Sequence, residues 1–448
     1  MNTVSCGHSG AHTHLDRKHL MNEAMELPYF LSDFEGVGGV IKQRPEDFFV
    51  QEIPLYDPTG DGDHVMAEIQ KVGISTFDAC EYIARQLNRD RRDVGFAGMK
   101  DAQAVTRQII TIPFVTPEEM MALKSDRITV QWASKHRSKI RLGHLAGNRF
   151  AIKIRDVDPM KVVTLRPALD ILAKRGVPNF FGEQRFGRRG NNDLLGAAFV
   201  RGDDKEVLRL FLGDPRPGED KADVFEARTY YMAADYEKAI RAWPRWAGME
   251  RRALARLSKT SNPYQAVMAV DMPVRRLWVT ALQSRIFNEI LAQRIDGIDH
   301  LLVGDMAYKH DNGACFYVED PEVERPRAEA FEISATGPMV GRRLSMPRGV
   351  VRDMEQALFD KYDIGPDDFR SSQRDRSHGD RRPLRIQPRD TQLESGVDEH
   401  GGFITVAFTL PAGAYATILL RELMRNDVAI EKPAVPDEEE SVDDDAGE

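Results

Sequence analysis

An aspartate in a glycine-bearing turn is the residue of this sequence best placed to do chemistry. Asp101 follows Lys100 and the turn around Gly98, inside the segment DVGFAGMKDAQAVTRQ, residues 93–108, and just before an expected strand. A carboxylate in a tight loop at the ends of core elements is a common catalytic position, because a rigid scaffold holds such loops in place. An aspartate that only caps a turn has the same surroundings, and for an isolated Lys-Asp pair that interpretation is the commoner one.

Two basic stretches with interleaved aromatic residues indicate RNA as a partner. The first stretch contains Arg137, Lys139, Arg141, Arg149 and Lys153 with His136, His144 and Phe150, and the second contains Phe180, Phe181, Arg185, Phe186, Arg188 and Arg189. Such stretches suit RNA because the cations meet phosphates while the rings stack on splayed bases. A solvated charged face over buried aromatic residues gives the same pattern. The pattern alone therefore favours neither RNA binding nor a solvated surface.

The net charge of −9 argues against a nucleic-acid partner only until its distribution is considered. Residues 437–448 hold eight acids and no base, and without them the balance is 62 minus 63, or −1. Tails of like charge are usually solvated, so we expect a disordered acidic tail over 431–448. No apolar run approaches the roughly 18 residues of a membrane helix, so no membrane partner is expected. The widely spaced Cys6, Cys80 and Cys315 indicate free thiols in a cytoplasmic protein.

The sequence lacks the usual cofactor and metal motifs. Residues 36–41 miss the third glycine of a dinucleotide-binding loop, and 95–100 lack the spacing and the Ser/Thr of a phosphate loop. Segment 57–68 nearly matches an EF-hand calcium loop, but its flanks look like strands, which favours a hairpin turn. The histidines and Cys6 of residues 1–19 fit no closed zinc site. We therefore expect no metal, no cofactor, and a disordered leader over 1–27.

The first half of the chain predicts strands with one early helix. Val65, Ala67 and Ile69 alternate along HVMAEIQKV, as in a strand with one apolar face. Ser75 is the expected N-cap of the next helix, with Asp78 as its partner. The buried stripe expected for this helix consists of Phe77, Cys80, Ile83, Ala84 and Leu87. Further strands are expected at 105–112, 128–132 and 150–154, and a helix at 167–174 before Gly176.

The second half is more helical before it returns to a strand. Residues 277–294 follow the 3.6-residue period and predict the clearest helix of the chain. The charged segment 366–383 predicts a mobile loop. FITVAFTL, residues 403–410, then predicts a strand, and 415–424 a helix. This return to strand and helix indicates an α+β fold that is interrupted by an inserted domain.

Seven sequence blocks together resemble the TruD family of tRNA pseudouridine synthases. In the family's order they are VIKQRPEDFFVQEIP (40–54), FAGMKDAQAVTRQ (96–108), KHRSKIRLGHLAGNRF (135–150), GVPNFFGEQRFGRRGNN (176–192), LQSRIFNEI (282–290), SATGPMVG (334–341) and LPAGAYATILLRELM (410–424). The resemblance runs from about residue 39 to 426. It implies a pseudouridine synthase catalytic fold, a mixed and largely antiparallel sheet with flanking helices, over 28–177 and 385–430. A more helical TRUD domain would be inserted over 178–384.

The resemblance also implies roles for particular residues. Asp101, in the family's G-x-K-D block, is implied as the catalytic aspartate, and Lys42 as the lysine beside it. The implied contacts of the target nucleotide are Phe48, Asn148, Phe150 and Tyr415. Tyr415 stands where bacterial members can carry Phe, so its ring is expected to stack in the same way. The basic residues expected to contact RNA are Arg137, Lys139, Arg141, Arg188 and Arg189.

The reaction implied by the resemblance is the isomerisation of a uridine in tRNA, at position 13 in bacterial members, to pseudouridine. This isomerase chemistry breaks an N-glycosidic bond and rejoins the uracil through carbon, with no metal or cofactor. The carboxylate must be ionised to act as a nucleophile at the sugar or as a base on its C2′ proton, and a nearby lysine favours ionisation. A non-catalytic RNA-binding protein or tRNA chaperone on the same scaffold is the alternative function, although binding alone needs neither Asp101 nor Lys42.

Overall fold

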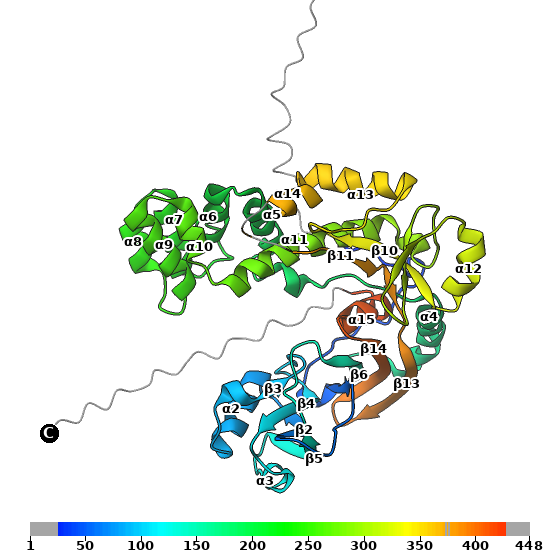
Figure 1. Cartoon of the computed structure of the whole chain (residues 1–448). Coiled ribbons are helices and arrows are strands. Elements are labelled where there is room, and N and C mark those ends of the chain that lie inside the picture. Colours follow the sequence, from blue (N-terminus) through cyan, green and yellow to red (C-terminus); the bar gives the residue numbers. More distant parts are fainter. Residues whose placement is uncertain (1–25, 372–373, 375–376, 427–448) are drawn as a thin grey trace, which may run out of the picture. The chain divides into compact units, whose positions relative to one another are not determined.

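The computed structural model describes residues 26–371, 374 and 377–426 (Figure 1). The predicted acidic tail, and the predicted leader up to residue 25, lie outside the described residues. The described chain divides into two compact units. The first unit comprises 26–32, 170–388 and 413–419, and the second comprises 33–169, 389–412 and 420–426. The domain boundaries predicted from the sequence stay a prediction.

Among the described residues, the second unit contains an eight-stranded sheet. Its strands are β1 (Phe48–Pro54), β2 (His64–Val72), β3 (Gly95–Phe96), β4 (Val105–Pro113), β5 (Ile128–His136), β6 (Leu145–Arg155), β13 (Arg389–Asp398) and β14 (Gly401–Pro411). The strand order is β13-β14-β6-β1-β4-β2-β5, with β3 paired to β4. Only β1 and β4 run parallel, and the other neighbours are antiparallel. The predicted mixed, largely antiparallel sheet is therefore confirmed.

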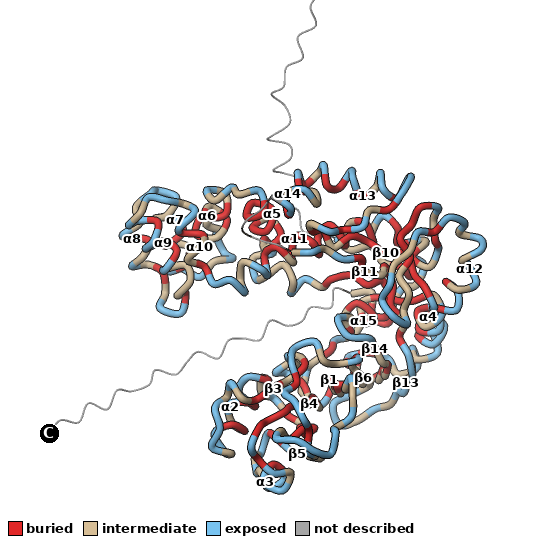
Figure 2. The backbone as a smooth tube through the Cα atoms, in the orientation of Figure 1, coloured by how far each residue is buried: buried red, intermediate tan, exposed pale blue. Residues whose placement is uncertain are grey.

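Strand β2 shows why this sheet needs a helix on one face. Val65, Ala67 and Ile69 are buried, and they pack in one cluster with Cys80 and Ile83 of the helix α2 (Thr76–Gln86). The alternation read from the sequence places these three residues on a single face, as observed. The strand is buried along most of its length, and so is its neighbour β4, whose tube is largely red in Figure 2.

Helix α2 begins as predicted but buries a different set of residues in its first turn. The Ser75 side chain accepts a hydrogen bond from the Asp78 amide at 3.1 Å, which caps the helix. The prediction that Phe77 is buried is wrong, because its side chain is 42% exposed. Thr76 and Ala79 occupy the inward positions of the first turn, so the Phe77 ring lies at the edge of the stripe.

Three further predictions need correction. The helix α4 (Val162–Arg175) begins before Pro167, because Asp158 caps the preceding turn through the Met160 amide at 2.9 Å. Residues 57–63 belong to a loop and form no hairpin, because β4 lies between β1 and β2 in the sheet. The segment 366–383, predicted as a mobile loop, contains α14 (Pro366–Ser371) and β11 (Asp380–Pro383) in its described part.

The first unit is mainly helical. Its helices include α5 (Asn192–Arg201), α6 (Asp204–Leu212), α7 (Ala222–Met232), α8 (Tyr236–Ala242), α9 (Gly248–Thr260), α10 (Pro263–Met268), α11 (Met272–Gln293), α12 (Pro321–Glu329) and α13 (Gly349–Tyr362). Helix α11, predicted as 277–294, packs against α5 and against the strand β10, and Figure 1 shows α5 to α10 as one green group. No helix of the described residues is long and apolar enough to cross a membrane.

Two small sheets complete the first unit within the described residues. The first has the order β11-β10-β8-β9 and includes β8 (Met306–Lys309), β9 (Cys315–Tyr317) and β10 (Ile333–Met339). The second pairs β7 (Val177–Pro178) with β12 (Arg385–Ile386). Strand β11 forms because the buried Arg381 guanidinium pairs with Glu355 at 2.7 Å and donates to the Thr336 carbonyl at 2.9 Å. The last helix, α15 (Ala416–Met424), begins one residue after the predicted start.

Candidate active site

Asp101 lies in the loop between β3 and β4, and Lys42 reaches it from the segment before β1. The Lys42 ammonium donates a hydrogen bond to Oδ2 of Asp101 and forms an ion pair with it. The same ammonium lies 4.5 Å from the centroid of the Phe48 ring. Lys42 has a φ of 60°, in the left-handed region. A side chain other than glycine is strained there, and such strain persists where the surrounding contacts enforce it.

Further contacts fix the backbone and the second oxygen of Asp101. Its Oδ1 accepts a hydrogen bond from the Gln103 amide at 3.0 Å. Its main-chain carbonyl accepts one at 2.9 Å from the ammonium of Lys71, which also donates to the Ile74 carbonyl at 2.6 Å. Lys71 is fully buried. The carboxylate is thus held at both ends, yet 34% of its side chain remains exposed to a ligand.

The charges around Asp101 keep it ionised. Burial raises the pKa of Asp101, but the hydrogen bond and charge of Lys42, the Gln103 amide and the charge of Lys71 together lower it below its usual range. Burial lowers the pKa of Lys71 to about 8, against the attraction of Asp101. Asp101 therefore carries its negative charge at neutral pH.

A second carboxylate near this loop behaves in the opposite way. Glu52 of β1 is buried, and burial raises its pKa despite the ion pair that it forms with Lys100 at 2.8 Å. The Lys100 amide donates to the Thr76 hydroxyl at 2.9 Å, which joins this loop to the start of α2. Lys100 and Asp101 are adjacent in the sequence but differ in role. Lys100 attaches the loop to the buried Glu52, whereas the Asp101 carboxylate is partly exposed.

The predicted nucleotide contacts Phe48, Asn148 and Phe150 share one face of the sheet. In the register of β1 and β6, Phe150 lies opposite Val50 and Asn148 opposite Glu52, and paired residues project to the same side. Phe150 is 7% exposed and its ring stacks on Phe408 with centroids 5.3 Å apart. The Oδ1 atom of Asn148 is buried and has no hydrogen-bond partner in the described residues. This face therefore combines aromatic rings with the acceptor of Asn148, which no described residue uses.

Tyr415 belongs to the first unit. The other predicted catalytic and nucleotide-contacting residues belong to the second unit: Lys42, Phe48, Asp101, Asn148 and Phe150. The Tyr415 ring meets Phe181 edge to face, with centroids 6.2 Å apart. Its hydroxyl accepts a long hydrogen bond from Nη2 of Arg185, at 3.4 Å. Tyr415 is thus set in an aromatic and basic environment of its own.

The basic residues predicted to contact RNA differ in how far their charges are free. Arg137 is 70% exposed but forms a bidentate pair with Asp61, with both contacts at 2.8 Å. Lys139 donates to the Arg92 carbonyl. The side chain of Arg141 is exposed and has no hydrogen bond or ion pair among the described residues, whereas its main-chain carbonyl accepts from the His144 amide at 3.1 Å. Its loop is attached to the segment before Asp101, because the Gly143 amide donates to the Ala97 carbonyl at 2.8 Å.

The two predicted arginines of the first unit lie in different environments. Arg188 is exposed, with no partner in the described part of the chain. Arg189 is 14% exposed and forms ion pairs with Asp214 and Asp220. Its charge is therefore already matched by carboxylates of its own unit, and it is better suited to hold the loop than to bind phosphate.

Sequence reasoning missed Lys71 and Glu52. Both continue an alternation that the sequence displays: Lys71 follows Ile69 on the inward face of β2, and Glu52 follows Val50 on the inward face of β1. A charged residue at an inward position of a strand was the available signal, since burying a charge requires a partner.

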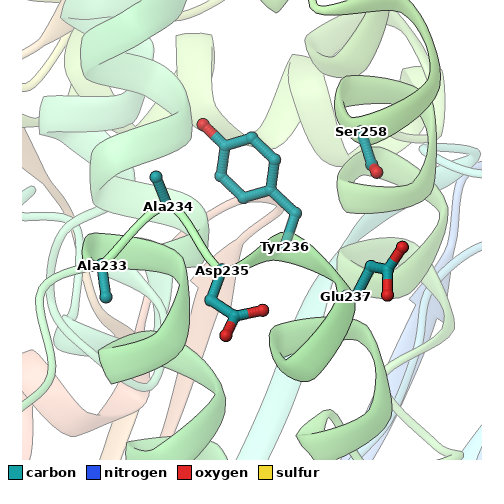
Figure 3. A pocket seen from close by; sticks show the side chains of 6 residues that line it. All are labelled: Ala233, Ala234, Asp235, Tyr236, Glu237 and Ser258. Atoms are coloured by element: carbon teal, nitrogen blue, oxygen red, sulfur yellow. The ribbon is translucent and has the colours of Figure 1, made fainter.

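A surface hollow that none of these residues lines is found in the helical part of the first unit (Figure 3). Its lining consists of Ala233, Ala234, Asp235, Tyr236, Glu237 and Ser258. The lining includes the carboxylates of Asp235 and Glu237 and no basic side chain. Asp235 forms an ion pair with Lys238 at 2.8 Å. The hollow therefore repels phosphate and is a poor candidate for an RNA site.

Comparison with known proteins decides the family. The sequence model described as tRNA pseudouridine synthase D (TruD) matches residues 24–423. The chain belongs to the TruD family. The tRNA pseudouridine synthase D of Geotalea daltonii is 43% identical, covering 89% of this chain and 100% of the relative. That of Geobacter sulfurreducens is 42% identical, covering 89% and 96% respectively.

Solved structures agree with this assignment. A crystal structure described as a tRNA pseudouridine synthase D (TruD) from Methanosarcina mazei matches with a TM-score of 0.79 and 26% identity, covering 92% of this chain and 98% of that one. The TruD resemblance and the α+β pseudouridine synthase fold predicted from the sequence are therefore confirmed. The residue roles within this TruD chain stay predictions.

Proposed function

We propose that this protein is a tRNA pseudouridine synthase that converts uridine 13 of tRNA to pseudouridine, with Asp101 as the catalytic carboxylate. The single observation that carries the proposal is the Asp101 carboxylate, paired with Lys42 and still partly exposed, in a chain of the TruD family. The curated relatives named above are tRNA pseudouridine synthases D over nearly the whole of their length.

The proposed reaction exchanges one bond of the uridine for another. The C1′–N1 bond breaks, the uracil turns, and its C5 joins C1′; C5 then loses its hydrogen while N1 gains one, so that the reaction is redox-neutral. Asp101 begins it either as a nucleophile at C1′ or as a base on the C2′ proton. Both roles need the anion, which Lys42 stabilises. Lys71 keeps the main chain of Asp101 in position.

The sheet face beside Asp101 supplies the surroundings that this rearrangement needs. The rings of Phe48 and Phe150 offer apolar walls that exclude water and hold the detached uracil. The unused Oδ1 of Asn148 accepts a hydrogen bond from the extruded nucleotide. Extrusion from folded tRNA costs about a few kcal/mol, which aromatic contacts and the exposed cations Arg141 and Arg188 offset. Tyr415, whose ring meets Phe181, is a further proposed contact of the tRNA.

The organisation of the chain is part of the same proposal. Residues 28–177 and 385–430 form the catalytic domain, and 178–384 form the inserted TRUD domain. We place the protein in the cytoplasm, where its tRNA substrate is made and used.

The test is the variant Asp101→Asn. We expect it to abolish pseudouridine formation and to change tRNA affinity by no more than about tenfold, or 1.4 kcal/mol, because the amide keeps the shape and loses the charge. Pseudouridine is read as carbodiimide-dependent reverse-transcription stops on tRNA treated with each protein. Turnover by the variant would remove Asp101 from its role, and tRNA binding without turnover by the wild type would favour the chaperone function.

A further inference from the structure

Two guanidinium groups of the first unit share one aromatic ring. The Cζ atom of Arg382 lies 4.2 Å from the centroid of Phe181, and that of Arg185 lies 5.3 Å from the same centroid. Tyr415 meets the same ring edge to face. The three polar residues come from η4 (Glu183–Phe186), from β11 and from the segment before α15. The fold thus brings three distant segments of the chain together around Phe181.

Neither guanidinium has a carboxylate partner among the described residues. Two buried arginines of this unit are matched by carboxylates: Arg381 pairs with Glu355 at 2.7 Å, and Arg294 pairs with Asp305 at 2.8 Å. Arg382 instead donates to the Asn179 side chain and to the Gly413 carbonyl, the latter at 3.1 Å. Within the described part of the chain, the cluster is therefore a concentration of positive charge without a carboxylate partner.

Donors remain free in this cluster. In each of the two guanidinium groups, Nη2 is the only nitrogen that donates a hydrogen bond to another described residue. The Nε atoms are buried without a partner, whereas the Nη1 atoms are neither bonded nor buried. Burial lowers the pKa of Arg382 to about 10, Tyr415 raises it and the charge of Arg185 lowers it. Arg382 stays charged at neutral pH, and an anion would relieve the repulsion between the two guanidinium groups.

We propose that Arg185, Arg382 and the Tyr415 hydroxyl form a binding site for one phosphodiester of the RNA substrate. The inference rests on the proposed function for the identity of the ligand. Arginine suits this ligand because its planar fork matches phosphate oxygens, and each guanidinium lies against the Phe181 ring, which restrains its position. The hydrogen bond from Arg185 to Tyr415 is long, at 3.4 Å, and therefore weak. When it breaks, the guanidinium and the hydroxyl can each donate to a phosphate oxygen.

The experiment measures tRNA affinity of the full chain at several salt concentrations for the wild type, Arg185→Gln and a matched control. Arg256→Gln is the control, since it removes one exposed arginine from α9 of the same unit. We expect Arg185→Gln to weaken binding by roughly tenfold or more and to flatten the log–log salt slope by about 0.7 to 0.9. The control should match the wild type in both affinity and slope.

Two further variants keep the test independent of folding. Arg185→Lys keeps the charge and loses the fork, so its slope should stay at the wild-type value while affinity falls. Tyr415→Phe removes only the hydroxyl and should weaken binding without changing the slope. Melting temperatures of all variants are measured alongside. Wild-type affinity and slope in a folded Arg185→Gln protein would overturn the site.

Separate outcomes distinguish this site from the proposed function and from a site for free phosphate. If the wild type forms pseudouridine and Arg185→Gln binds tRNA as the wild type does, the site is wrong and the function stands. If no pseudouridine forms but the salt slope depends on Arg185, the site stands and the function is wrong. Calorimetric binding of inorganic phosphate alone at submillimolar concentration, lost in Arg185→Gln, would assign the site to free phosphate and overturn the RNA assignment.

Discussion

Asp101 is held by one contact on each of three of its atoms. Lys42 contacts Oδ2, the Gln103 amide contacts Oδ1, and Lys71 contacts the main-chain carbonyl. Side chain and backbone are therefore positioned together, which is what a carboxylate needs if it must meet one atom of an extruded sugar. Of these three contacts, the one from Lys71 is the hardest to predict from the sequence, because Lys71 is fully buried and lysine is normally a surface residue.

The substitution Lys71→Met tests this positioning role. It removes the donor to the Asp101 and Ile74 carbonyls, so the loop loses its anchor while the carboxylate is retained. We expect single-turnover pseudouridine formation to slow by roughly 100-fold, because small displacements of a catalytic group have effects of that size. Binding of tRNA should stay close to that of the wild type. An unchanged rate would show that the loop holds its shape without Lys71.

The same residue predicts how stability depends on pH. Burial lowers the pKa of Lys71 from 10.5 to about 8. Between these values the unfolded chain holds a proton that the folded chain has released, so the free energy of unfolding rises with pH. We expect the wild type to gain stability relative to Lys71→Met as the pH rises from about 8 to 10.5. Urea unfolding of both proteins across this range measures the difference, and a constant difference would contradict the prediction.

At the scale of the elements, β6 and β14 hold the aromatic face together. Phe150 and Phe408 stand opposite each other in the register and stack, so Phe150 belongs to the core as well as to the candidate site. We expect Phe150→Ala to lower the free energy of unfolding by about 3–5 kcal/mol, because it leaves a cavity. Phe150→Leu keeps most of the volume and should lose less stability.

Turnover separates the two roles of Phe150. If its ring also lies against the target base, Phe150→Leu should lose far more turnover than tRNA affinity at a temperature where it is fully folded. Turnover by folded Phe150→Leu at the wild-type rate would leave Phe150 as a core residue alone.

The loop between β5 and β6 makes a prediction about RNA affinity. Arg141 is exposed and free among the described residues, whereas Arg137 is matched by Asp61. If this loop lies against RNA, Arg141→Ala should flatten the log–log salt slope of tRNA binding by about 0.7 to 0.9. Arg137→Ala should flatten it less, because part of that charge is already neutralised within the protein. Equal slopes for the wild type and both variants would exclude the loop from the RNA interface.

At the scale of the whole molecule, the two units interleave along the chain. Residues 413–419 belong to the first unit, although they lie between two segments of the second. Tyr415 is in this short segment, which explains why its neighbours, Phe181 and Arg185, come from the helical unit. The chain therefore distributes its candidate RNA contacts over both units.

Deletion of 431–448 tests the sequence-based view of the acidic tail, which lies outside the described residues. The segment has few apolar residues, and its carboxylates repel phosphate. We expect the truncated protein to fold with an unchanged melting temperature, to form pseudouridine at the wild-type rate, and to bind tRNA at least as tightly. Loss of folded protein on truncation would show instead that the tail packs as structure.

The family, the fold class and the strand alternation could be predicted before folding was considered, because they depend on the order of sequence blocks and on periodicity. The sequence also indicated Asp101, since an acid in a glycine-bearing turn is a local feature. Which charges are free, in contrast, could be seen only in the folded chain. Lys71 meets the Asp101 carbonyl across 30 residues, and Arg189 finds Asp214 and Asp220 beyond its own loop. Periodicity tells which way a side chain points, whereas its partner depends on which segments the fold brings alongside it.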